Sequence, residues 1–288
     1  MDIGFVGMGV MGRPMAANLV AAGHRLVVHR DTPAARELLG TNVRYAVSAA
    51  DATRASDVVV LMLPDTPDVE VVMRGDDGVL SALQPGTLVI DMSSISPAAE
   101  RELAERVGRA GGHYLDAPVS GGEIGAREGT LSIMVGGDPE TVDWARPILD
   151  VLGSRVSHVG AVGAGQVAKI ANQILVGVTI EAVAEALRLV EAADVDPVAV
   201  HSALMGGFAS SRVLEVHGPR MIKGEFEPGF RIRLHRKDLG LAVEAATQLD
   251  VALPTASMVH QLMNAAVAAG LADRDHSALR LVLDGSRP

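Results

Sequence analysis

The sequence has 288 residues, 48% hydrophobic but only 2% aromatic, so it is long enough for one large or two ordinary domains with an aliphatic core. Its 25 Lys and Arg residues against 35 Asp and Glu residues give a formal net charge of -10, which argues against a nucleic-acid partner. Cysteine is absent, which excludes disulfides, thiolate catalysis and cysteine-zinc sites. The start does not resemble a secretory signal, and Glu181 and Glu185 interrupt the most apolar later stretch. We therefore expect a cytoplasmic protein without a membrane segment.

Up to about residue 160, short runs rich in Val, Ile and Leu alternate with longer helical patterns. Several of these runs are apolar throughout, which is typical of parallel strands covered on both faces. Helices are predicted at 11–23 and 97–111, where Gly23 and Gly111 mark the ends. The predicted strands are 2–7, 25–29, 57–63, 86–93, 112–119 and 130–137. This alternation predicts an α/β fold with a Rossmann-type doubly wound sheet.

After residue 160 the pattern becomes helical throughout. One helical pattern without proline runs from 164 to 193, which corresponds to about 45 Å at about 1.5 Å per residue. Further helices are predicted at 196–205, 235–249 and 254–270. The change from mixed to all-helical patterns places a domain boundary near residue 160.

The first glycine run, Gly7-x-Gly9-x-x-Gly12, follows a predicted strand and opens a predicted helix, and another strand follows. This is the context that the dinucleotide-binding fingerprint requires. Gly7 permits the tight turn, Gly9 lets the backbone approach a pyrophosphate, and Gly12 allows close helix–strand packing. A purely structural turn is the alternative, and the context favours dinucleotide binding.

The next strand bears on the choice of cofactor, because an acidic residue at its end would bind the adenosine ribose and repel a 2′-phosphate. Here the strand ends in His29 and Arg30, and Asp31 follows. Arg30 could pair with a phosphate in forked geometry, which favours NADP. Asp31 could instead bind the ribose of NAD, and a solvated Arg-Asp turn is a third interpretation. The residues therefore favour NADP and leave NAD open.

A second glycine run with similar spacing occurs in "GAGQVAKIANQ" at 163–173. No returning strand is predicted after the long helix, so this segment lacks the βαβ unit of a second nucleotide site. Lys169, Asn172 and Gln173 are spaced i, i+3 and i+4 and project together from the helix. Two interpretations of the lysine stay open on spacing alone: a partly desolvated amine with a lowered pKa, or a side chain that snorkels from an interface helix.

Five motifs in order resemble the β-hydroxyacid dehydrogenases over essentially the whole chain. The motifs are "GFVGMGVMGRPMAANL", "DMSS", "DAPVSGG", "GAGQVAKIANQ" and "HRKDL". The resemblance implies a dinucleotide-binding Rossmann domain, 1–162, joined by the long helix to an all-helical substrate and oligomerisation domain, 163–288. Within the family, "GEIGAREGTLSIMVGG", "PGFRIRLHRKDL" and "DHSAL" look most like the tartronate semialdehyde reductases.

The resemblance also implies roles for individual residues. Lys169 matches the catalytic general acid/base, Asn172 contacts the substrate, and Lys237 lies near both nicotinamide and substrate. The substrate carboxylate is assigned to a loop of three residues, Ser120, Gly121 and Gly122. The residues implied to contact the cofactor are Gly7, Gly9, Met11, Gly12, His29, Arg30, Leu63, Pro64, Ser94 and Lys237.

The implied activity is NAD(P)H-dependent reduction of a short aldehyde acid, with tartronate semialdehyde (2-hydroxy-3-oxopropionate) giving glycerate as the favoured reaction. The alternatives are 3-hydroxyisobutyrate dehydrogenase, glyoxylate/succinic semialdehyde reductase, imine reductase and a non-catalytic nucleotide-binding regulator. Lys169 argues against the last two, since imine reductases of this superfamily usually replace the lysine and a regulator would not need it.

Two further expectations concern metals and partners. The nine histidines show no H-x-x-x-H or H-E-x-x-H spacing, so no metal is expected. The long apolar helix predicts a homodimer or homotetramer, because one small helical domain can hardly cover it. A small hydroxyacid or aldehyde-acid substrate is expected as the only other partner, with no nucleic acid and no membrane.

Overall fold

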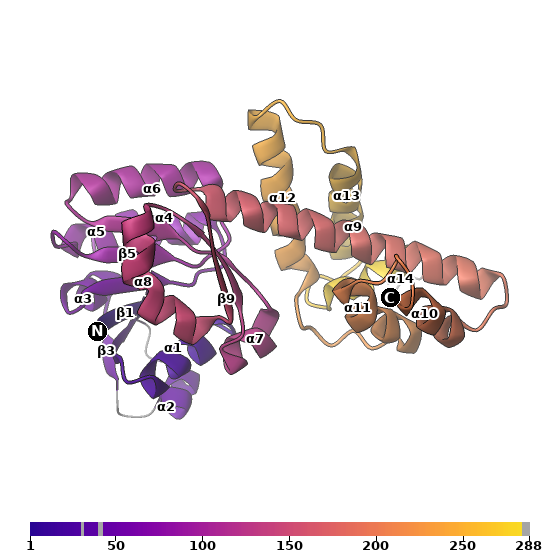
Figure 1. Ribbon diagram of the computed structural model, residues 1–288, viewed down its shortest axis with the longest axis horizontal. Helices are drawn as coiled ribbons and strands as arrows, with labels where there is room; N and C mark the ends of the chain where they lie inside the picture. The colour runs from indigo at the N-terminus through magenta and orange to yellow at the C-terminus, as the bar shows by residue number, and fades with distance from the viewer. Residues whose placement is uncertain (30–31, 40–42, 284–288) are drawn as a thin grey trace. The chain divides into compact units, whose positions relative to one another are not determined.

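The computed structural model describes residues 1–29, 32–39 and 43–283 (Figure 1). The chain divides into two compact units, Met1–Lys169 and Ile170–Pro288, and the division falls inside the long helix α9 (Ala164–Ala192). The boundary predicted between 162 and 163 stays a prediction.

The first unit contains a sheet with nine strands among the described residues, in the order β3-β2-β1-β4-β5-β6-β8-β7, and β9 pairs with β8. Pairing is parallel from β3 to β6, whereas β8 runs antiparallel to β6 and β7 and parallel to β9. The strands are β1 (Asp2–Val6), β2 (Arg25–His29), β3 (Arg44–Ala46), β4 (Val58–Leu61), β5 (Leu88–Asp91), β6 (His113–Asp116), β7 (Val119–Ser120), β8 (Ser132–Gly136) and β9 (Arg155–Gly160). The order 3-2-1-4-5-6 is that of a Rossmann sheet, so the predicted fold class is confirmed.

Helices cover both faces of this sheet. On β4, Val58 and Val60 belong to one hydrophobic core, while Val59 and Leu61 belong to another. The first core includes buried residues of α1 and α8, and the second includes those of α4 and α6. The helices of this unit, besides the start of α9, are α1 (Gly12–Ala21), α2 (Pro33–Leu39), α3 (Ala49–Arg54), α4 (Thr66–Arg74), α5 (Val79–Ala82), α6 (Pro97–Arg109), α7 (Gly122–Glu128) and α8 (Pro139–Leu152). Burial on both faces explains why strands such as β4 are apolar throughout.

The strand predicted at 25–29 matches β2, and the other predicted strands are present but shorter. The run predicted at 112–119 forms two strands, β6 and the start of β7, which pair with different parts of β8. The three-residue β3 was not predicted, because Arg44–Ala46 is too short to show a period.

The second unit is helical. After α9 it contains α10 (Pro197–Met205), α11 (Arg212–Lys223), α12 (Ile232–Gln248), α13 (Pro254–Ala268), a short 3-10 helix η1 (His276–Leu279) and α14 (Arg280–Leu283). Its core is aliphatic and centres on residues such as Ile180, Leu239 and Val259, from α9, α12 and α13. Within the described part of the chain, no helix combines the length and apolar character that a membrane span needs.

Candidate functional site

The first glycine run forms the turn between β1 and α1. Gly7 has a φ of +109°, and a Cβ there would lie 2.2 Å from the Met62 carbonyl oxygen. A Cβ on Gly12 would lie 1.8 Å from the Gly7 carbonyl oxygen, whereas Gly9 has open space around it. Gly7 and Gly12 are therefore required by the fold, and Gly9 leaves room for a ligand next to the backbone. No described side chain caps the N-terminus of α1 at Met11, so this end of the helix can bind a phosphate, with the Gly12 N–H as a donor.

The carboxyl ends of β4 and β5 lie at the same edge of the sheet as this turn, because the three strands are parallel and adjacent. Leu63 and Pro64 follow β4, and the Leu63 N–H donates to Ser93 Oγ at 2.9 Å. The Ser93 N–H donates in turn to Asp91 Oδ1 at 2.8 Å, and half-buried Ser94 comes next. The fully buried Ser93, which the sequence interpretation missed, thus connects the two turns predicted to line the cofactor.

Of the three residues predicted to determine the preference for NADP or NAD, the structure describes His29. His29 is the last residue of β2 and lies next to Ala46 of β3. Arg30 and Asp31 lie outside the described residues, so their roles stay predictions.

The predicted carboxylate loop follows β7, in which Ser120 pairs with Ser132 of β8. Gly121 and Gly122 have φ values of +138° and +62°. Two consecutive residues in this region favour glycine, because a Cβ there would be strained. The turn presents backbone N–H groups beside a half-buried serine, an arrangement that suits a small carboxylate.

The second glycine run packs the first turn of α9 against the sheet. The N–H groups of Gly163 and Gln166 donate to the two Asp116 carboxylate oxygens at 2.7 and 2.9 Å. A Cβ on Gly165 would lie 2.4 Å from the Met134 carbonyl oxygen of β8. These glycines therefore allow a close helix–sheet contact, and no strand follows α9 among the described residues to complete a nucleotide-binding unit.

A buried polar cluster anchors the same turn. Gln166 Nε2 donates to Glu100 Oε1 at 2.6 Å and to the Ser93 carbonyl oxygen at 2.8 Å. The Tyr114 hydroxyl donates to Glu100 Oε2 at 2.6 Å. Burial, together with the nearby charges of Asp91 and Asp116, raises the pKa of Glu100 well above its usual value. The sequence interpretation missed this cluster, which fixes the helix that carries Lys169.

Lys169 lies one turn after Gly165 and is only 7% exposed. It lies next to the buried Ile170 and one helical turn from Gln166, which the cluster holds. This burial favours a desolvated amine over a snorkelling one.

A chain of polar side chains lies in the second unit. Asn172 Nδ2 donates to Gln173 Oε1 at 2.7 Å, and Gln173 Nε2 donates to Asp238 Oδ2 at 2.5 Å. Lys237 Nζ forms an ion pair with Asp238 Oδ1 at 2.9 Å. Gln173 and Asp238 are buried. Two predicted substrate residues, Asn172 and Lys237, are thus connected through Gln173 and Asp238. Asp238 was missed, although it stands in the "HRKDL" motif.

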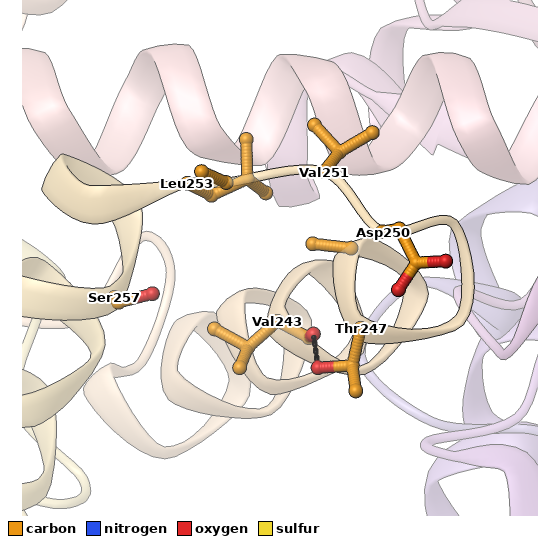
Figure 2. A pocket seen from close by; sticks show the side chains of 8 residues that line it. Val243, Thr247, Asp250, Val251, Leu253 and Ser257 are labelled. Atoms are coloured by element: carbon orange, nitrogen blue, oxygen red, sulfur yellow. Dashed lines mark hydrogen bonds between the residues drawn. The ribbon is translucent and has the colours of Figure 1, made fainter.

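A separate pocket of about 380 Å³ lies at the end of α12 (Figure 2). Its lining residues are Val243, Ala246, Thr247, Asp250, Val251, Ala252, Leu253 and Ser257. None of these described residues belongs to the predicted cofactor or substrate sites, so the candidate site lies elsewhere.

Both units match known protein families. Residues 2–160 match the family described as the NAD binding domain of 6-phosphogluconate dehydrogenase. Residues 163–283 match the family described as NAD-binding of NADP-dependent 3-hydroxyisobutyrate dehydrogenase.

Individual relatives match over nearly their whole length. The chain is 51% identical over 284 residues to the 2-hydroxy-3-oxopropionate reductase of Escherichia coli K12, covering 99% of this chain and 97% of that protein. It is 38% identical over 286 residues to the 3-hydroxyisobutyrate dehydrogenase of Pseudomonas aeruginosa, covering 96% and 95%. The solved structure of Mycobacterium tuberculosis 3-hydroxyisobutyrate dehydrogenase with L-serine is 38% identical, with a TM-score of 0.89 and 98% of each chain covered.

Proposed function

Since this chain belongs to the β-hydroxyacid dehydrogenase family and is an NAD(P)-dependent oxidoreductase, we propose that it reduces tartronate semialdehyde to glycerate. The observation that supports this choice of substrate is the 51% identity, over 99% of the chain, to the Escherichia coli 2-hydroxy-3-oxopropionate reductase. A second candidate, 3-hydroxyisobutyrate dehydrogenase, is supported by the 38% identity to that enzyme of Pseudomonas aeruginosa.

We assign the chemistry of proton transfer to Lys169. NAD(P)H, when bound, supplies a hydride to the aldehyde carbon. As negative charge grows on the carbonyl oxygen, the Lys169 ammonium hydrogen-bonds to that oxygen and then protonates it. In the direction of alcohol oxidation, the neutral amine accepts the same proton. The burial of Lys169 supports this role, because an ammonium in a water-poor site interacts more strongly with a developing charge.

The cofactor site that we propose follows the edge of the sheet. The turn of Gly7, Gly9 and Gly12 receives the pyrophosphate at the N-terminus of α1, with Met11 beside it. Further along the same edge, Leu63, Pro64 and Ser94 line the nicotinamide half. We propose NADP in preference to NAD because of Arg30, with His29 at the end of β2 next to it.

For the substrate we propose two groups of binding residues. Its carboxylate binds the turn of Ser120, Gly121 and Gly122, where two positive φ values orient the backbone N–H groups. Asn172 and Lys237, which the Gln173–Asp238 pair connects, contact the rest of the substrate. Lys237 also contacts the cofactor.

For the assembly we propose a cytoplasmic homodimer or homotetramer with 1–162 and 163–288 as its domains. Support comes from apolar side chains of α9 that are exposed in the single chain, Leu175 at 70% and Leu189 at 72%. A second copy would cover them.

The test is a panel of tartronate semialdehyde, methylmalonate semialdehyde, succinic semialdehyde and glyoxylate, each with NADPH and NADH. We expect the highest kcat/KM for tartronate semialdehyde with NADPH. A higher kcat/KM for methylmalonate semialdehyde would instead assign the chain to 3-hydroxyisobutyrate dehydrogenase. The absence of turnover with every substrate, in protein that binds NADPH, would overturn the proposal.

A further inference from the structure

Three imidazoles form a continuous chain inside the second unit, which we call the histidine chain: His217 of α11, His235 of α12 and His276 of η1. His235 Nε2 lies 3.0 Å from the backbone carbonyl oxygen of Gln173, and His235 Nδ1 lies 2.9 Å from His276 Nδ1. His276 Nε2 lies 3.2 Å from His217 Nε2, and His217 Nδ1 lies 3.5 Å from Asp275 Oδ1. The histidine chain thus runs from α9, which carries Asn172 and Gln173, to the buried carboxylate of Asp275.

Two of the three histidines and Asp275 are shielded from water, whereas the His217 side chain is 13% exposed. His235 and Asp275 are 0% exposed and His276 is 5% exposed. The Phe230 ring packs against the His235 and His276 rings, with centroids 5.8 and 5.6 Å apart. Because few waters can reach these nitrogens, the hydrogen bonds between the rings decide where each proton lies.

In the histidine chain, the hydrogen-bond acceptors determine which ring nitrogen of each imidazole carries a proton, beginning at Gln173. The Gln173 carbonyl oxygen only accepts, so His235 carries its proton on Nε2 and its Nδ1 accepts from the Nδ1–H of His276. Burial lowers the pKa of His276 well below its usual value, so His276 is neutral and its Nε2 accepts from His217. His217 therefore donates through Nε2 to His276, and its Nδ1 lies 3.5 Å from Asp275 Oδ1.

Both carboxylate oxygens of Asp275 already accept hydrogen bonds from other groups. Burial by itself would raise the pKa of Asp275, but hydrogen bonds, with that from His217 first among them, hold it well below its usual value. Its other partners are the Gly229 and Phe230 N–H groups, the Ser277 N–H and hydroxyl, and Arg220 Nη1. His217, Asp275 and His276 are close enough to share a metal ion, but these donors occupy the lone pairs that a metal would need.

The other end of the histidine chain contacts Gln173, which lies next to the predicted substrate residue Asn172. A Cβ on Gly177 would lie 3.2 Å from His235 Nε2, so this glycine lets the imidazole reach a main-chain carbonyl in the middle of α9. The residue contacted there, Gln173, is also the one whose side chain connects Asn172 to Asp238 and hence to Lys237. His235 thus holds the backbone of Gln173, the residue whose side chain connects Asn172 to Asp238.

We propose that the histidine chain positions Gln173 and through it the substrate contacts of Asn172 and Lys237. His235 is the positioning residue that touches α9, and His276 and His217 fix its tautomer. The proposal rests on the proposed function for the roles of Asn172 and Lys237, but the proton positions in the histidine chain do not depend on any activity.

The first experiment measures those positions directly in the full chain. Histidine-labelled protein is studied by long-range proton–nitrogen NMR near pH 7, and the resonances are assigned with single His variants. We expect His235 to be protonated on Nε2 and His276 on Nδ1 only. A His276 proton on Nε2, or a His235 without a proton on Nε2, would overturn the proposal whether or not the protein reduces tartronate semialdehyde.

The second experiment separates positioning from general stability with two variants of one residue. In His235→Gln, an amide N–H can replace the Nε2–H donor to Gln173, whereas His235→Leu removes it. We expect His235→Leu to lower kcat/KM about tenfold with a smaller change in the NADPH dissociation constant, and His235→Gln to recover most of that loss.

A His235→Leu variant that binds NADPH normally and keeps the parental kcat/KM would sink the positioning role. If the Leu variant does not fold, His217→Asn serves instead, because its amide can still donate to Asp275 but cannot reach His276. We then expect a changed His276 tautomer and a lowered kcat/KM; parental values for both would also contradict the proposal.

Discussion

The Asp116 carboxylate accepts a hydrogen bond from the Gly163 N–H at 2.7 Å, although 47 positions separate the two residues in the chain. Asp116 ends β6, and Gly163 precedes α9 by one residue. The same carboxylate binds the Gln166 N–H, so it holds the first turn of the helix that carries Lys169. The position of the predicted catalytic lysine therefore depends on how closely this turn approaches the sheet.

The first prediction tests that close approach. In Gly165→Ala, the new Cβ would lie 2.4 Å from the Met134 carbonyl oxygen and 2.8 Å from Asp116 oxygens. We expect the free energy of unfolding to fall by at least about 2 kcal/mol, because backbone on both sides must shift. Gly108→Ala is the matched control, since a Cβ there meets nothing within 4 Å and should leave stability equal or raise it by up to about 1 kcal/mol. Urea unfolding of both variants checks this, and equal effects would contradict the packing argument.

The second prediction concerns Lys169. Lys169→Ala should keep its affinity for NADPH but lose at least about a hundredfold in kcat, because proton transfer to the carbonyl oxygen loses its donor. Lys223→Ala is the control, since Lys223 is exposed at the end of α11. The measurements are NADPH titration and steady-state kinetics. Turnover within a few-fold of the parent would remove the assigned role.

The third prediction concerns the choice of cofactor. Arg30→Ala should weaken NADPH more than NADH, because the forked pairing of a guanidinium with the 2′-phosphate is lost. Arg109→Ala, a change of an exposed arginine on α6, is the control. Dissociation constants for both cofactors decide the matter, and equal effects on the two would rule out phosphate binding by Arg30.

The fourth prediction concerns a buried carboxyl group in the middle of α9. Glu181 is 4% exposed, and burial, followed by the nearby Glu185 charge, raises its pKa from 4.5 to about 7. The folded state therefore binds a proton more tightly than the unfolded state, so this group lowers stability as the pH rises from about 4.5 to about 7 and costs most above that range. Glu181→Gln should thus raise the free energy of unfolding by on the order of 2 kcal/mol near pH 8, with much less change near pH 4.5.

The exposed Glu185 offers a control for this prediction. Glu185→Gln removes only a neighbouring charge and should show a smaller pH-dependent gain. Urea unfolding at the two pH values measures both variants. A Glu181→Gln gain that does not vary with pH would show that Glu181 is ionised alike in the folded and unfolded states.

Local patterns in the sequence were sufficient to predict the fold class and to identify several candidate site residues. Apolar runs such as Val58–Leu61 predict buried parallel strands, because every side chain of a doubly covered strand must be apolar. The spacing of Gly7, Gly9 and Gly12 predicts the turn that the structure contains, since the steric demands of that turn act within a few residues. Helical periodicity likewise places Lys169 on the same face as Asn172.

The tertiary structure decided which buried groups hold these residues in place. Gln173 and Asp238 are 65 positions apart, and His235 and His276 are 41 apart. No local period connects such pairs; they meet only because helices from distant parts of the chain pack together, and each buried polar group must then find a partner among whatever that packing brings within reach. The sequence alone thus determined the fold class and the local turns, whereas the partners of Lys237, Gln173 and the three histidines followed from packing.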